Sequence, residues 1–230
     1  MLFRSSLCVD IKAPEGLDIV HSMLRDADVF VENFGPGALD RNGLGWEKVH
    51  AINSRLIYCA LKGFLPGPYE KRPAMDEVVQ MLGGLAYMTG LPDRPLRAGA
   101  SVADITGGVM GALGVMAALR QRDSDGQGRQ VMSSLFETVA FFMGQHLAEE
   151  AMSGRQPMPM AMRRKSWAVY ELFPTADSRE IFIAVLSQRH WVGLCKALGL
   201  DDEAGAERFS SNDRRLANVM EVRQIGRAHV

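Results

Sequence analysis

A single carboxylate stands at the start of a run of small and apolar residues. Asp104 is followed by no other charged residue until Arg120, and glycines recur at Gly107, Gly111 and Gly114. An aspartate with its ordinary pKa of about 3.9 is ionised at neutral pH and can attack a carbonyl carbon without a general base. Near a helix start, the same residue type also caps free N–H groups. Position alone favours a cap, and the residues leave both interpretations open.

The residues around Asp104 predict a long helix. Apolar side chains recur at helical spacing at Ile105, Val109, Leu113 and Met116, and we expect this stripe to be buried. The three glycines lie on a neighbouring face, where each costs about 1 kcal/mol relative to alanine. Because the three glycines destabilise the helix in this way, we predict that another element packs very close to the helix backbone.

Strand and helix patterns alternate through the first part of the chain. The predicted strands and helices, in order, are strand 7–11, a helix opening at Pro14, strand 29–32, helix 46–52 and strand 55–61. This order is typical of a parallel α/β sheet, in which ligands bind beyond the carboxyl ends of the strands. The segments Asn33-Phe34-Gly35 and Lys62-Gly63-Phe64 follow two such ends and are candidate ligand-binding segments.

The second half of the chain predicts a domain boundary. A capping box at Ser134 and Glu137 opens a helix that Gly154 closes. We predict a Rossmann-like α/β domain with a parallel sheet over residues 6–155, a linker over 156–165, and the start of a smaller α+β domain over 166–224.

Composition argues against several classes of partner. The net charge is −1, with 26 basic and 27 acidic residues, so nothing indicates nucleic acid or an anionic membrane surface. The three cysteines are scattered and the histidines show no ligand spacing, so we expect no metal site. We find no stretch of about 20 apolar residues and no signal-peptide core, and we predict a cytoplasmic protein without a membrane partner.

Both termini resemble translated sequencing-adapter DNA. These tails are residues 1–5 and 225–230, and they predict an assembled metagenomic fragment. We therefore expect the natural protein to continue in both directions, with part of the large domain missing before residue 6 and the small domain incomplete.

Four segments together resemble the family III CoA-transferases, which include formyl-CoA transferase, carnitine CoA-transferase and α-methylacyl-CoA racemase. They occur in the same order as in the family, within residues 7–222, and are Ala27–Arg41, Asn53–Tyr58 with Lys62–Phe64, Gly99–Gly108 and Asp125–Arg129. The resemblance implies that Asp104 attacks an acyl-CoA thioester and that CoA passes to an acceptor acid through acyl-aspartyl and aspartyl-CoA intermediates. It therefore favours the nucleophile over the cap.

The same resemblance implies further site residues and a partner. The positions that match CoA-contacting residues of the family are Asn33, Phe34, Gly35, Arg41 and Lys62. CoA is then a substrate, and no permanently bound cofactor is expected. Family members form interlocked dimers, in which each chain threads through a ring made by the other, so we expect a homodimer of the full-length protein.

Met75 and Asp76 are also predicted to line the CoA-binding site, and they bear on the type of reaction. The racemases carry a catalytic His where Met75 stands, and methionine cannot move a proton. Asp76 beside it either positions the ligand or only solvates the loop. The sequence thus predicts a CoA-transferase, with an acyl-CoA racemase or isomerase and a non-catalytic CoA-binding fragment as alternatives.

A basic cluster in the predicted linker suggests a substrate class. Arg163, Arg164 and Lys165 are hypothesised to bind the distal carboxylate of a dicarboxylic acid, because arginine suits bidentate carboxylate binding. The alternative is a solvated linker. The glycine-rich loop of formyl-CoA transferase has no match within 158–170, which argues against formate and oxalate as the acids.

Overall fold

The chain divides into two compact units, Met1–Met162 and Arg163–Val230. The computed structural model describes residues 4–162, 166–175 and 177–223. The boundary between the units falls inside the segment 156–165. Each unit has a core of its own and is described separately.

The first unit is an α/β domain built on a parallel sheet of order β1-β2-β3. Its elements are α1 (Pro14–Asp26), β1 (Val29–Glu32), α2 (Ala38–Arg41), α3 (Trp46–Ile52), β2 (Ile57–Lys62), α4 (Asp76–Leu82), α5 (Leu85–Thr89), α6 (Val102–Asp125), β3 (Gln130–Ser134), α7 (Leu135–Ser153) and the 3-10 turn η1 (Met160–Met162). The α/β fold with a parallel sheet is the one that the sequence predicts.

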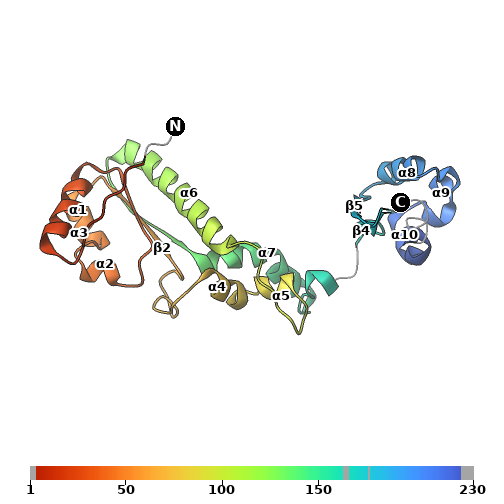
Figure 1. Cartoon of the computed structure of the whole chain (residues 1–230), viewed down its shortest axis with the longest axis horizontal. Helices are drawn as coiled ribbons and strands as arrows, with labels where there is room; N and C mark the ends of the chain where they lie inside the picture. The colour runs from red at the N-terminus through yellow and green to blue at the C-terminus, as the bar shows by residue number, and fades with distance from the viewer. Residues whose placement is uncertain (1–3, 163–165, 176, 224–230) are drawn as a thin grey trace. The chain divides into compact units, whose positions relative to one another are not determined.

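Alternate residues of the central strand face opposite layers of helix. Tyr58 and Ala60 pack with buried leucines of α1 and α2 and with Val49 of α3. The neighbouring residues Cys59 and Leu61 face α6 instead. Figure 1 shows α1–α3 on one side of the strands and α6 on the other. Because both faces of β2 are covered, its sequence is almost continuously apolar, as in other parallel sheets.

The glycines of α6 allow the close approach that the sequence predicts. A Cβ atom on Gly111 would lie 2.6 Å from Cδ2 of Leu61, and one on Gly114 would lie 2.6 Å from Cγ1 of Val131. The Ser133 hydroxyl also donates a hydrogen bond of 2.8 Å to the Gly107 carbonyl. The glycine face of α6 therefore rests directly on β2 and β3.

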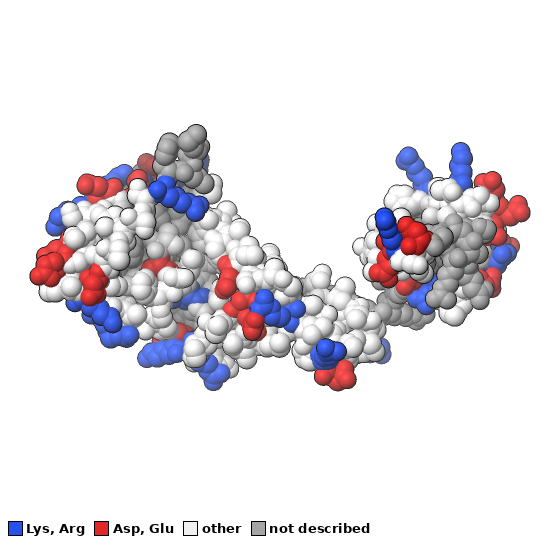
Figure 2. Space-filling model, viewed as in Figure 1, with Lys and Arg blue, Asp and Glu red and all other residues white. Residues whose placement is uncertain are grey.

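The expectation of a buried apolar stripe on α6 is wrong. Ile105, Val109, Leu113 and Met116 are each about 60% exposed or more. The sheet takes the glycine face, so the neighbouring apolar face points away from it. By length and composition alone, α6 could cross a membrane. One such helix is weak evidence for a membrane span, and α6 packs on β2 and β3. Figure 2 shows few charged atoms over α6 in this view.

The predicted strand 7–11 is also wrong, because this segment forms no strand. The Asp10 side chain accepts a hydrogen bond from the Lys12 N–H (2.9 Å), and the Asp10 carbonyl accepts one from the Ala13 N–H (3.1 Å). These local bonds form a turn that leads into α1 and compete with pairing to a strand.

The second unit contains a two-stranded antiparallel sheet and short helices. Its elements are β4 (Tyr170–Pro174), β5 (Glu180–Ala184), α8 (Gln188–Ala197), α9 (Asp201–Gly205), the 3-10 turn η2 (Glu207–Phe209) and α10 (Asn212–Ala217). Trp191 and Phe209 are fully buried at its centre, with ring centroids 5.6 Å apart.

Candidate active site

A cavity of about 620 Å³ lies where β2 and β3 end and α4 and α6 begin. Its volume is typical of a small-molecule site. Five of the predicted site residues line it: Asn33, Lys62, Met75, Asp76 and Asp104. The fold therefore brings together residues that are up to 71 positions apart, counted from 33 to 104.

The loop that ends at Met75 and leads into Asp76, the first residue of α4, is held against the end of β2. A Cβ atom on Gly63 would lie 2.1 Å from Cβ of Ala74, so only glycine fits at this position. This contact explains the glycine after Lys62, and it brings Asp76 to the start of α6.

Asp76 caps the helix that carries Asp104. Its Oδ2 accepts hydrogen bonds from the N–H groups of Ala103 (2.8 Å) and Asp104 (3.1 Å). Its Oδ1 accepts one from the side chain of Gln80, which is fully buried. Asp76 is itself only 6% exposed. The capping function that position suggested for Asp104 thus belongs to Asp76.

The Asp104 carboxylate is left free at the cavity. Among the residues that the structure describes, none donates a hydrogen bond to it, and the residue is exposed. Partial burial raises the pKa of Asp104 above its ordinary value, and the negative charge of Asp76 raises it further. A carboxylate with a raised pKa is more basic, which strengthens it as a nucleophile.

Lys62 is paired with a carboxylate that the sequence did not single out. Its ammonium lies 2.6 Å from Oε1 of Glu32 and donates hydrogen bonds of 2.8 Å to Oε2 of Glu32 and to the Phe34 carbonyl. The Glu32 side chain is 2% exposed and also accepts a hydrogen bond from the Phe34 N–H (2.9 Å). Lys62 and Glu32 therefore fix the backbone of the Asn33–Gly35 segment.

Arg41 lies in a second cavity, of about 560 Å³, which Lys62 also lines. Arg41 and Lys71 supply further cations there, and Trp46, Tyr58 and Phe64 supply aromatic surface. Acidic residues line the same cavity: Glu32, Asp40 and Glu70. Such a mixture of cations and rings can hold phosphates and a purine ring.

Three of the predicted site residues, Phe34, Gly35 and Met75, have few other atoms packed around them. Phe34 is 48% exposed, and neither it nor Gly35 is among the residues that line the two cavities. A Cβ atom on Gly35 would meet no atom within 4 Å. Met75 is 70% exposed at the mouth of the Asp104 cavity.

Two functional candidates escaped sequence reasoning. Glu32 precedes the Asn33–Gly35 segment directly, and its place at the end of a strand was the available signal. Arg97 lines the Asp104 cavity and pairs with Glu77, the residue after Asp76. Its signal was a cation two residues before Gly99, where the glycine-rich run begins.

The N–H groups of Ala103 and Asp104 at the start of α6 both donate to Asp76, so they are not free to bind an oxyanion in the cavity. The basic cluster 163–165 lies outside the described residues. Within the part of the chain that the structure describes, no group of three or more His, Cys, Asp or Glu could hold a metal ion.

The geometry agrees with what comparison with other proteins shows. The family described as CoA-transferase family III matches residues 4–228. The chain belongs to this family. A crystal structure of a CAIB/BAIF family protein from Brucella suis, 31% identical, superposes with a TM-score of 0.83 over 96% of this chain and 59% of that one.

Two relatives of this family III member have assigned reactions. Succinate–glutarate CoA-transferase of Agrobacterium fabrum is 34% identical over 224 residues, which are 96% of this chain and 56% of the relative. Formyl-CoA:oxalate CoA-transferase of a Bradyrhizobium strain is 42% identical over 137 residues, which are 59% of this chain and 32% of the relative. The chain thus spans little more than half the length of the first relative.

Proposed function

We propose that the protein transfers CoA between carboxylic acids and that Asp104 is the nucleophile. The observation that carries this proposal is that two neighbouring carboxylates have different roles. Asp76 is buried and caps α6, whereas Asp104, in the first turn of that helix, offers an unpaired carboxylate to the cavity. Family membership supports the same chemistry.

The reaction divides one exchange into steps that need no net proton transfer. An Asp104 oxygen attacks the thioester carbonyl and the C–S bond breaks. This step releases CoA thiolate and forms an acyl-aspartyl anhydride. The thiolate attacks the Asp104 carbonyl carbon, which releases the donor acid and forms an aspartyl-CoA thioester. The acceptor carboxylate displaces the thiolate to form a second anhydride. Thiolate attack on the acceptor carbonyl then yields the new acyl-CoA and restores Asp104.

The two cavities suggest how acyl-CoA is held. We place the thioester in the Asp104 cavity, with Asn33, Met75 and Asp76 around it, and the phosphates near Arg41 in the second cavity. Lys62 lines both cavities and is paired with Glu32, so it holds the segment carrying Phe34 and Gly35 beside the CoA path.

Met75 supports transfer over racemisation. Moving an α-proton requires a group that can accept and return it. Met75 stands at the mouth of the cavity in the position that a catalytic His takes in the racemases, and its thioether cannot do this. Family resemblance further suggests an interlocked homodimer for the full-length protein, and the composition of the chain suggests a cytoplasmic location.

Mass spectrometry of the full-length protein with succinyl-CoA tests the proposal. We expect a CoA adduct on the peptide that carries Asp104, and hydroxylamine treatment should convert the same residue to a hydroxamate. Asp104→Asn should show neither product and should lose CoA transfer by a factor of about 10³ or more, as when a covalent nucleophile is removed. Transfer that survives in Asp104→Ala would refute the proposed nucleophile.

A further inference from the structure

The Asp104 cavity contains two cations among its described lining residues, Lys62 and Arg97. They differ in how firmly they are held. The Lys62 ammonium makes contacts of 2.6–2.8 Å with a Glu32 side chain that is 2% exposed. Taking Lys62 away would leave a buried carboxylate without a partner, which is costly. The Lys62 ammonium therefore stays paired with Glu32 and is not available to a ligand.

Arg97 is held much more loosely. It pairs with Glu77 of α4, whose side chain is 61% exposed, and the Arg97 side chain is 40% exposed. An exposed pair of this kind contributes only about 0–1 kcal/mol. A ligand carboxylate can replace Glu77 at little cost, because the Glu77 carboxylate then returns to water.

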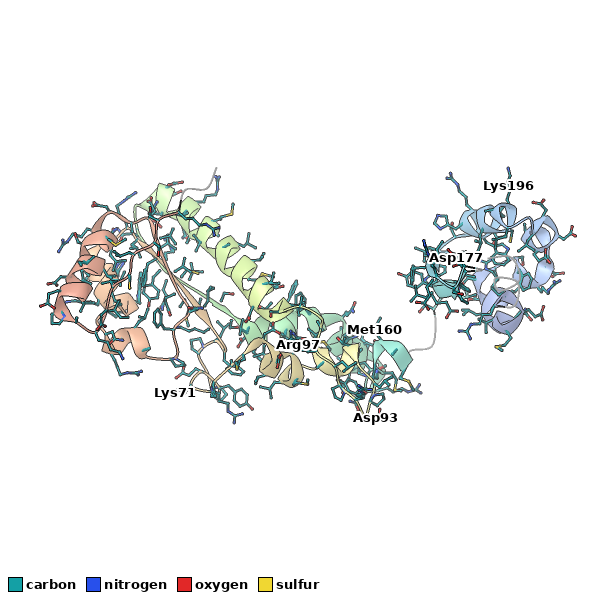
Figure 3. All side chains as sticks on the ribbon, in the orientation of Figure 1. Lys71, Asp93, Arg97, Met160, Asp177 and Lys196 are labelled. Carbon is teal, nitrogen blue, oxygen red and sulfur yellow. The ribbon has the colours of Figure 1, made fainter. Side chains whose placement is uncertain are left out.

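The backbone next to Arg97 is nevertheless fixed. The N–H of Ala98 donates a hydrogen bond of 2.8 Å to the side-chain oxygen of Gln80, whose amide nitrogen donates to Asp76. Gln80 is fully buried. Figure 3 shows Arg97 beside α4, near the start of α6. The guanidinium thus extends from an anchored point that is tied to the same carboxylate that caps α6.

The position of Arg97 in the Asp104 cavity limits which anionic group of the substrate it can bind. In acyl-CoA the pantetheine arm separates the thioester from the phosphates. If the thioester reaches Asp104, the phosphates lie outside this cavity, and Arg41 and Lys71 serve them in the second one. An anion at Arg97 then belongs to the acyl group itself, and a planar guanidinium matches a carboxylate through two parallel hydrogen bonds.

We propose that Arg97 binds the distal carboxylate of a dicarboxylic acyl group and thereby makes the protein prefer dicarboxylic over monocarboxylic substrates. This inference rests on the proposed CoA transfer through Asp104. It assigns to Arg97 the specificity that the sequence suggested for the basic cluster 163–165.

Steady-state kinetics of the full-length protein with two donors tests the inference. Succinyl-CoA and butyryl-CoA have four-carbon acyl chains, and only the first carries a distal carboxylate. Arg97→Gln should lower kcat/KM for succinyl-CoA by roughly 10- to 100-fold, the range expected for losing a charged hydrogen-bonded pair. The value for butyryl-CoA should change by less than about three-fold, within the usual range of surface substitutions.

Two further variants separate recognition from general damage. Arg97→Lys keeps the charge but loses the bidentate geometry, so its loss with succinyl-CoA should be intermediate. Arg94→Gln makes the same change in the same loop at an exposed residue that does not line the cavity, and the ratio of the two donors should stay as in the wild type.

The outcomes distinguish this inference from the proposed function. Equal losses with both donors in Arg97→Gln, an unchanged donor ratio, or a wild-type preference for butyryl-CoA would each overturn the inference while leaving CoA transfer intact. Failure of the proposed function would show instead as full transfer by Asp104→Ala.

Discussion

At the scale of single residues, the site depends on a difference between two carboxylates: Asp76 has hydrogen-bond donors and Asp104 has none among the described residues. Asp76 accepts hydrogen bonds from two backbone N–H groups and is buried. Asp104 has a raised pKa because the site partly desolvates it and places it near the charge of Asp76. The protein therefore holds the ionised form of Asp104 in an unfavourable environment, as is common where a reactive group is kept available.

We expect Asp104→Asn to raise the melting temperature at neutral pH while it abolishes transfer. A carboxyl whose pKa is higher in the folded state than in the unfolded state lowers stability above both pKa values. As the pH falls through the folded pKa toward the unfolded value of about 3.9, this cost disappears. The gain in melting temperature should therefore shrink with decreasing pH, measured by calorimetry.

Asp125, in the last turn of α6, provides the matched control. A hydrogen bond from the Arg129 side chain is the main cause that lowers the pKa of Asp125. Its stabilising effect is present above the unfolded pKa and is lost as the pH falls through the folded pKa. Asp125→Asn should thus lower the melting temperature at neutral pH. The same sign of change in both variants would contradict this account.

The sequence predicted the site residues that match motifs of the family. It did not predict roles that depend on contacts between distant segments of the chain. Asp104, Asn33, Lys62, Met75 and Asp76 were singled out, and they line one cavity. That Asp76 caps α6 depends on a contact between residues 27 and 28 positions apart, which no local pattern reports. Arg97 and Glu32 escaped for the same reason, because their partners come from other segments.

At the scale of elements, α6 shows why helical spacing alone does not tell which face is buried. The chain offers two faces, one of apolar side chains and one of glycines. Close packing against β2 and β3 uses the glycines, since Leu61 and Val131 occupy the space where their Cβ atoms would lie. The glycine penalty predicted this contact correctly, while the apolar periodicity predicted the wrong side.

Substituting two glycines of α6 measures the value of this close approach. Gly111→Val should lower the free energy of unfolding by about 1–3 kcal/mol, because its side chain would overlap Leu61. Gly108→Val should be neutral or slightly stabilising, since a Cβ at Gly108 meets no atom within 4 Å and valine is the better helix former. Urea unfolding of both variants tests this, and equal effects would show that α6 is not held by its glycine face.

Strand prediction succeeded where pairing partners exist. The predicted strands 29–32 and 55–61 correspond to β1 and β2, which pair in parallel from Val29 with Ile57 to Glu32 with Ala60. The segment 7–11 has similar composition, but Asp10 forms a turn. Composition reports a preference for extended backbone, whereas a strand also requires a neighbour.

At the scale of the whole molecule, each unit has its own packed centre. The first unit buries two clusters, one between the sheet and α1–α3 and one among α4, α5 and α7. The second unit is organised around Trp191. The order of strands and helices was enough to predict the α/β class. It could not show which apolar faces the rest of the chain covers, because that depends on contacts between distant segments.

The exposed stripe of α6 has a consequence for how the 230-residue chain behaves in isolation. Ile105, Val109, Leu113 and Met116 form a continuous apolar surface along the helix. Exposed apolar patches of this kind promote association. We expect the chain to self-associate in a concentration-dependent manner and Leu113→Glu to reduce this, as measured by light scattering.

The charge change must be separated from the loss of the stripe. Leu113 is 61% exposed, so Leu113→Glu should alter the free energy of unfolding by no more than about 0.5 kcal/mol. Met152→Glu adds the same charge at a residue of α7 that is 89% exposed and lies outside the stripe. If association depends on the stripe, Met152→Glu leaves it nearly unchanged. If both variants reduce association equally, net charge controls it and the apolar face of α6 does not.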